Sequence, residues 1–212
     1  MTSRIADIEI PDSALAKEAT ELVRDTAGPL LYDHSRRVFL FGALRGRHRE
    51  LTFDPELLYV AALFHDLGLT PRYAASRQRF ELDGAEAAQD FLLRHGLPPE
   101  RARTAWTAVA LHTTPEIPYR MEPEVALVTA GVEVDVLGLG FDEVDDAQRD
   151  AVVAAHPRPD FKRQILRAFT EGIAHRPASA FGNVKSDVLA HFVPGFVRTD
   201  FVTVIENSGW PE

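Results

Sequence analysis

Apolar residues recur along most of the chain at the three- and four-residue spacing of amphipathic helices, and strict alternation is nearly absent. This pattern predicts helices over residues 13–26 and 29–44. The mostly apolar stretch 55–68, which contains LLYVAALFHDLG, predicts a helix at the centre of the core. Asp54 is its expected N-cap, with proline at the first helical position, and Gly68 is its expected end.

The second half of the chain is also predicted to be helical, with proline or aspartate at the helix starts. Asp83 is expected to cap the helix GAEAAQDFLLRH, and Asp145, Asp160 and Asp200 are expected to cap later helices. Further helices are predicted over 99–111 and 123–138, and one short helix within the turn-rich segment 179–196. Because no linker-like composition interrupts this pattern, we expect an all-α fold of one domain.

Composition narrows the range of functions. The 212 residues are 45% hydrophobic and 26% charged, as in ordinary globular proteins, and the absence of cysteine excludes thiolate metal sites, iron–sulfur clusters and cysteine nucleophiles. The net charge of −9 and the scattered arginines offer no basic patch, so no nucleic-acid partner is expected. No apolar run approaches the roughly 20 residues of a membrane span. The first residues do not resemble a secretory signal, so we expect a cytoplasmic protein that acts on a small molecule.

The adjacent pair His65-Asp66 stands at the end of the apolar helix AALFHDLG. Aspartate is almost never fully buried unless it is paired. A metal ion would satisfy both side chains at once, because imidazole and carboxylate are good ligands for Zn²⁺, Fe²⁺ or Mn²⁺. The alternative is a helix-end pair that hydrogen-bonds to the backbone.

Three more residues of metal-ligand type lie on the apolar faces or at the ends of other predicted helices. His34 lies in LYDHSRRVFLFGAL, Asp135 lies in GVEVDVLG, and His112 ends the helix AVALHTT. Each residue alone is more often structural. Together with His65-Asp66 they indicate a metal site built in the interior of a helical bundle.

The order His34, His65-Asp66, Asp135 resembles the H…HD…D ligand pattern of the HD superfamily of metal-dependent α-helical enzymes. Local strings, among them DHSRRVFLFG, AALFHDLGLT, ALHTTPEI and FGNVKSDVLAHFVPGF, resemble the cyanamide hydratase-like branch over roughly residues 28–211. The resemblance implies a helical HD bundle over residues 28–212 with a C-terminal helical extension, preceded by an N-terminal helix or extension over 1–27.

The same resemblance implies one Zn²⁺ held by His34, His65, Asp66 and Asp135, with Fe²⁺ or Mn²⁺ as other possible metals. The implied reaction is the hydration of cyanamide to urea by metal-bound hydroxide. In this reading Asp66 both ligates the metal and accepts a proton.

Three more residues complete the expected site. His112 or Thr113 is expected to donate to the substrate nitrogen, and Glu81 is a further candidate proton carrier. The alternative for Glu81 is a solvated loop carboxylate.

Two departures from the wider superfamily favour a single metal and a substrate of low charge. Two-metal HD enzymes usually carry a histidine four residues before a Gly-Ala pair, whereas here Phe80 precedes Gly84-Ala85. In the wider superfamily the HD pair often continues as HD-x-G-K, whereas here Leu69 stands in the place of the lysine. The missing positive charge weakens a phosphate-binding interpretation.

Other functions remain open. An HD-type phosphohydrolase acting on nucleotides or other phosphoesters is the main alternative, and Arg72, Arg77 and Arg79 are its candidate phosphate contacts. A non-enzymatic sensor that binds a metabolite is another alternative. An iron oxygenase of the HD type is disfavoured, because such an enzyme needs two metals and Phe80 offers no ligand for the second. The aromatic-rich C-terminal segment is expected to pack on its own bundle or on a second subunit, so a homodimer is possible.

Overall fold

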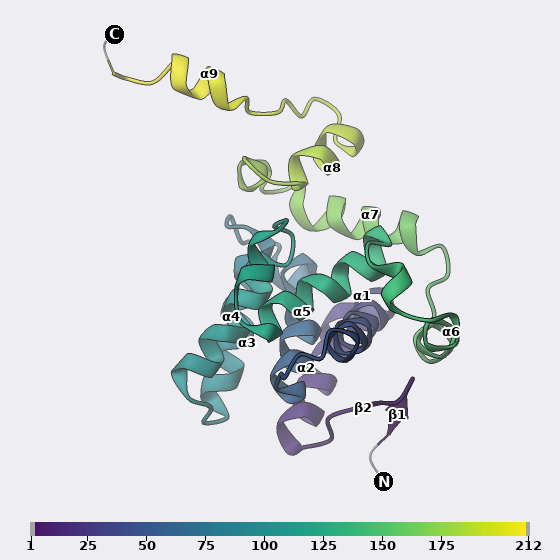
Figure 1. The fold of residues 1–212 in the computed structure, drawn as a ribbon. Helices are drawn as coiled ribbons and strands as arrows, with labels where there is room; N and C mark the ends of the chain where they lie inside the picture. The colour runs from purple at the N-terminus through teal and green to yellow at the C-terminus, as the bar shows by residue number, and fades with distance from the viewer. Residues whose placement is uncertain (1–2, 211–212) are drawn as a thin grey trace.

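In the computed structural model, which describes residues 3–210, helices follow one another from α1 (Ala14–His48) to α9 (Phe201–Glu206) (Figure 1). Between them lie the following helices: α2 (Pro55–Phe64), α3 (Phe80–Arg94), α4 (Pro99–Leu111), α5 (Pro123–Val132), α6 (Asp146–Ala155), α7 (Phe161–Ile173) and α8 (Lys185–Phe192). The prediction of an all-α, single-domain fold is confirmed. The sequence does not predict the hairpin of β1 (Arg4–Ile5) and β2 (Ile8–Glu9), because two-residue strands are too short to show alternation.

Helix α2 is the centre of the core, as its apolar sequence predicts. Every residue from Leu57 to Phe64 is buried, and α1, α3, α4 and α5 all pack against this helix. Asp54 caps it through hydrogen bonds to the backbone amides of Glu56 and Leu57. The buried helix therefore ends in the middle of the bundle, and the His65-Asp66 pair follows at that end.

Helix α1 contains the two predicted helices, joined at a kink. Gly28 has φ of 68°, outside the helical range, and Pro29 begins the second segment. This second segment reaches His48 rather than residue 44 and crosses α5 closely, since a Cβ at Gly131 would lie 2.1 Å from the carbonyl oxygen of Val38. The close crossing holds His34 of α1 near residues 133–137, which follow α5.

One predicted cap is wrong, and a second, Asp160, is the N-cap residue but makes no capping hydrogen bond through its side chain. Helix α3 begins at Phe80, so Asp83 lies within its first turn and is instead buried in an ion pair with Arg176. Asp160 precedes α7, but its side chain makes no capping hydrogen bond and accepts from Arg163. The side chain forms no cap in either case, because an aspartate near a helix start serves equally well as the partner of an arginine. The predicted caps Asp145 and Asp200 are confirmed.

The segment just before α6 is bound to the end of α1 by ionic contacts. Glu143 accepts hydrogen bonds from Arg49 at 2.8 Å and from Arg45 at 2.7 Å. The hydrogen bonds from Arg49 and Arg45 outweigh the effect of burial and lower the pKa of Glu143 to about 2.

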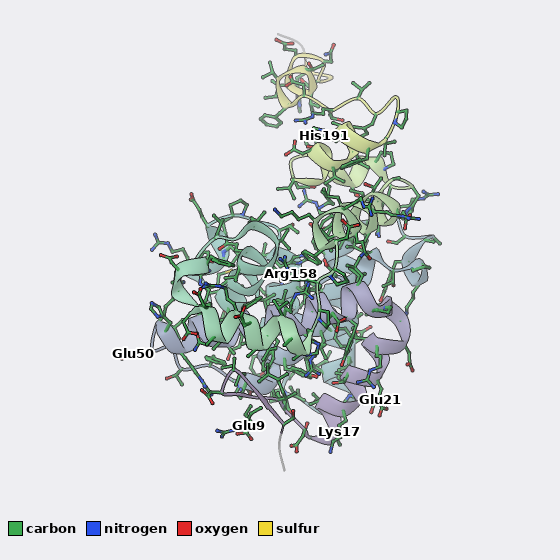
Figure 2. The ribbon with its side chains drawn as sticks, turned by 90° about the vertical axis from the view of Figure 1, so that its right-hand side faces the viewer. Glu9, Lys17, Glu21, Glu50, Arg158 and His191 are labelled. Carbon is green, nitrogen blue, oxygen red and sulfur yellow. The ribbon has the colours of Figure 1, made fainter. Side chains whose placement is uncertain are left out.

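The C-terminal helices extend away from the bundle. Helix α7 lies against it, while α8 and α9 continue outward, and His191 marks α8 in Figure 2. Val197, Phe201 and Trp210 are exposed in this last segment. The expected homodimer stays a prediction. In the part of the chain that the structure describes, none of the helices combines the length and apolar character needed to span a membrane.

Candidate metal centre

Three histidines and one aspartate meet where α1, α2 and α4 approach one another. His34 lies in the second segment of α1, His65 and Asp66 follow α2 directly, and His112 follows α4. All four side chains are buried, with at most 4% of each residue exposed. The alternative, a helix-end pair that hydrogen-bonds to the backbone, holds for His65, whose Nδ1 bonds to the carbonyl oxygen of Ala62. It does not hold for Asp66, whose carboxylate oxygens make no hydrogen bond within the described residues.

Each of the three imidazoles is held through its Nδ1 atom. The Nδ1 of His65 donates to the carbonyl oxygen of Ala62 at 2.7 Å, and that of His112 donates to Val109 at 2.6 Å. The Nδ1 of His34 lies 2.7 Å from a carboxylate oxygen of Asp135. Because carbonyl and carboxylate oxygens only accept, all three rings carry their hydrogen on Nδ1 and turn an Nε2 lone pair inward.

These inward atoms converge on Asp66. The Nε2 atoms of His65 and His34 lie 3.3 and 3.4 Å from its Oδ2, and the Nε2 of His112 lies 3.5 Å from its Oδ1. The Nε2 atoms of His34 and His65 are 3.1 Å apart. His34, His65 and Asp66 form a group whose ligand atoms all lie within 4.8 Å of one another, close enough to share one ion.

The site has unsatisfied polar atoms that a cation would satisfy. Both carboxylate oxygens of Asp66 and the Nε2 of His112 are buried and make no hydrogen bond within the described residues. Buried polar groups normally have hydrogen-bond partners, so these unsatisfied atoms are suited to binding a divalent metal. Nitrogen and carboxylate ligands suit Zn²⁺, Fe²⁺ and Mn²⁺ without selecting sharply among them.

The pKa directions describe an ionised carboxylate among imidazoles. Burial alone would raise the pKa of Asp66, but His65, His112 and His34 hold it well below its usual value. Burial lowers the pKa of His34 despite its bond to Asp135. For His65 burial acts in the same direction, but the Asp66 carboxylate outweighs it and raises the pKa. A negative ligand is therefore present at neutral pH.

Asp135, which the sequence predicts as a metal ligand, has other partners here. Its carboxylate accepts from Arg37 Nε at 2.8 Å and Nη2 at 2.9 Å, besides the contact to His34. Although burial raises the pKa of Asp135, hydrogen bonds from His34 and Arg37 hold it below its usual value. Within the described residues, Asp135 is not brought into the group of three that can share an ion. Its contact with His34 is suited to orienting that ring, and the expectation that Asp135 is itself a metal ligand stays a prediction.

A cavity of about 190 Å³ opens beside the cluster. Its lining, within the described residues, is the following: His34, His65, Asp66, His112, Thr113, Thr114, Pro115, Thr129, Val132, Glu133, Val136, Leu137, Phe169 and Val184. No arginine or lysine is among them. Arg77 and Arg79, which the sequence offers as phosphate contacts, instead donate to backbone carbonyls of His175 and Phe181. Arg72 lies over the ring of Tyr73.

The remaining predicted residues divide between the cavity wall and the layer behind it. His112 and Thr113 line the cavity. Glu81 does not line it and is 1% exposed, so the alternative of a solvated loop carboxylate is wrong. Phe80 packs with its ring centroid 5.6 Å from that of His112 and supplies no ligand.

Three residues of the site carry too little sequence signal to be identified. Arg37 and Lys185 are fully buried, and charged residues in helices are usually solvated. Thr129 lines the cavity with a hydroxyl that makes no hydrogen bond to any residue of the described chain, 3–210. A threonine within the apolar run VALVTAGV is a weak signal, because such hydroxyls commonly bond to their own helix.

The comparison with protein-family models found one match. A model described as "HD domain" matches residues 31–136, which is half of the chain. The matched segment begins in the second part of α1 and ends just after Asp135, so it contains all four histidine and aspartate side chains of the cluster. No curated protein matches the chain.

Proposed function

Because the chain belongs to the HD domain family, whose members are generally metal-dependent hydrolases, we propose that it is a metalloenzyme with a single divalent ion. The proposed metal is zinc, and the proposed reaction is the addition of water to a small nitrile such as cyanamide, giving urea. The proposed ligands are His34, His65, Asp66 and His112, with Asp135 as the residue that fixes His34.

The observation that carries this proposal is the cavity. It is small, it opens directly onto the cluster, and its wall within the described residues contains no cationic side chain. A phosphoryl group carries negative charge and is normally met by lysine or arginine, whereas a neutral nitrile needs none. Phe80, in the position where two-metal enzymes have a histidine, supports one ion rather than two.

A zinc ion bound here would supply Lewis acidity and lower the pKa of a water molecule toward about 7. Asp66 is ionised and its oxygens make no hydrogen bond within the described residues, so it would be positioned to take a proton from that water. Attack of the water oxygen on the nitrile carbon would break one π bond of the nitrile, and the nitrile nitrogen would take up the proton that Asp66 accepted. The Thr129 hydroxyl has no partner in the described residues, so it is free to donate a hydrogen bond to that nitrogen. The resulting imidic acid tautomerises to urea.

The hydrogen bond of Thr113 favours a role other than the expected donation to the substrate nitrogen. Its hydroxyl donates to Glu81 at 2.6 Å, so its hydrogen is already engaged. His112 likewise has its hydrogen on Nδ1, bonded to Val109. Donation to the nitrile nitrogen therefore falls to Thr129 rather than to either residue.

The test joins metal analysis with an assay for urea on one preparation. The proposal expects about one zinc per chain and urea formation from cyanamide, with both lost in Asp66→Ala while the helical circular dichroism stays. Zinc-loaded protein that leaves cyanamide unchanged would overturn it.

A phosphohydrolase is the second candidate, and the family match favours it. It requires that a phosphoester bind without a cation from the cavity wall. A screen of nucleotides with the metal-loaded protein decides between the two, because rapid phosphate release without urea formation supports only this candidate.

A further inference from the structure

Lys185 is a fully buried lysine outside the segment that the family model matches. It is the first residue of α8, it is 0% exposed, and its ammonium nitrogen lies 5.2 Å from the centroid of the Phe80 ring. A charge in such surroundings must be paired. Its partner is Glu81, to which Lys185 Nζ donates a hydrogen bond.

Glu81 joins Lys185 to the cavity wall. Its Oε1 accepts from Lys185 and, at 2.6 Å, from the hydroxyl of Thr113, which lines the cavity. Burial alone would raise the pKa of Glu81, but Lys185 and His112 lower it, so the carboxylate is ionised and only accepts. The hydroxyl hydrogen of Thr113 therefore points away from the cavity.

A hydroxyl that already donates its hydrogen in one hydrogen bond can only accept a hydrogen bond from a ligand. Toward the cavity, Thr113 is then a hydrogen-bond acceptor, and the group it suits is an N–H or O–H donor. A nitrile that carries an amino group supplies such a donor, whereas an alkyl nitrile does not. The acceptor role of Thr113 therefore favours a nitrile with an amino group over an alkyl nitrile.

We propose that Lys185 and Glu81 are positioning residues, which fix Thr113 as the acceptor for an amino group next to the nitrile of the substrate. This inference rests on the proposed hydration reaction and narrows its substrate to an amino-substituted nitrile. It also makes α8 a part of the site, although that helix lies outside the matched family segment.

The same helices provide a matched control. Asp83 is also on α3, is 4% exposed, and forms a buried ion pair with Arg176, which follows α7. Its carboxylate accepts from Ser76 and Gln78, not from Thr113. Asp83 also does not line the cavity within the described residues. Asp83→Asn therefore weakens a buried pair of the same kind without touching the proposed chain of contacts.

The experiment is a double-mutant cycle on zinc-loaded protein with Lys185→Met, Thr113→Val and their combination. Each single variant is expected to lower kcat/KM for cyanamide about tenfold, the value of one good hydrogen bond, and the pair also about tenfold. The preference for cyanamide over dimethylcyanamide, which has no N–H, falls by a similar factor. Asp83→Asn lowers the melting temperature but changes kcat/KM less than twofold.

Additive losses, near a hundredfold in the double variant, would overturn the inference, as would an equal loss of kcat/KM in Asp83→Asn. Crystal structures test it without turnover. The contact between Thr113 and Glu81 is expected to persist in Asp83→Asn and to be lost in Lys185→Met, and its survival in Lys185→Met would overturn the positioning role. Wild-type protein that does not hydrate cyanamide would refute the proposed function instead, and the crystallographic result would still decide the role of Lys185.

Discussion

Replacing Asp135 with asparagine removes the negative charge that lies between His34 and Arg37. The aspartate holds the Nδ1 of His34 at 2.7 Å and two nitrogens of Arg37 at 2.8 and 2.9 Å. Asparagine keeps one acceptor oxygen but turns an amide donor toward either His34 or Arg37, which are donors themselves. One of the two contacts is lost in the variant.

Two effects of different size follow. Loss of the partner that orients a ligating histidine typically lowers metal affinity by about 10–100-fold, which is about 1.4–2.7 kcal/mol. Breaking a buried ion pair costs about 3 kcal/mol, and for a chain of this length the melting temperature falls by about 6–12 °C. Zinc affinity is measured by competition with a chelator, and unfolding by circular dichroism on the metal-free proteins.

Asp83→Asn is the control, because it perturbs the buried pair with Arg176 away from the cluster. It is expected to lower the melting temperature by a comparable amount while the zinc affinity changes less than twofold. The reasoning is refuted if Asp135→Asn keeps wild-type zinc affinity. A loss of affinity beyond about a thousandfold would also contradict it, since the usual effect of an outer partner is far smaller and the carboxylate would then be a ligand, as the sequence predicts.

Three further predictions concern packing, pH and the metal. Gly131→Ala places a methyl group 2.1 Å from the carbonyl oxygen of Val38 and is expected to cost about 2 kcal/mol and lower the melting temperature by about 4–8 °C. As a control, Gly209→Ala meets no atom of the described residues within 4 Å and should leave the melting temperature unchanged. Glu143→Gln is expected to cost about 1 kcal/mol at pH 7. Because the folded pKa lies below the ordinary value, this difference is full above pH 4.5, shrinks as the pH falls toward about 2, and is checked by urea unfolding across that range. His65→Ala should reduce bound zinc from about one per chain to background while helical circular dichroism is kept, and retained zinc would contradict the assignment.

The sequence predicts helices best where start signals and apolar spacing agree. The Asp54-Pro55 start and the buried run after it predict α2 correctly, and the His65-Asp66 pair is recognisable because neither residue suits the end of an apolar helix. The start of α3 is predicted four residues late, because Asp83 resembles an N-cap but is the partner of an arginine distant in sequence.

The residues behind the cavity wall could not be predicted in the same way. Glu81 is a candidate from the sequence, but its partner Lys185 lies 104 residues further along the chain and resembles a solvated charge, so that only the folded chain makes them a buried pair. Asp135 shows the same limit. Its apolar surroundings indicate a core carboxylate, but whether that carboxylate faces a metal or a histidine depends on where Arg37 lies.

The most direct test of a single-metal hydratase is to measure zinc and urea together on one preparation, titrating metal-free protein with zinc in the presence of cyanamide. The rate of urea formation should rise linearly and reach its plateau at about one zinc per chain. A plateau at two metals, or full zinc loading with no urea formed, would contradict the account.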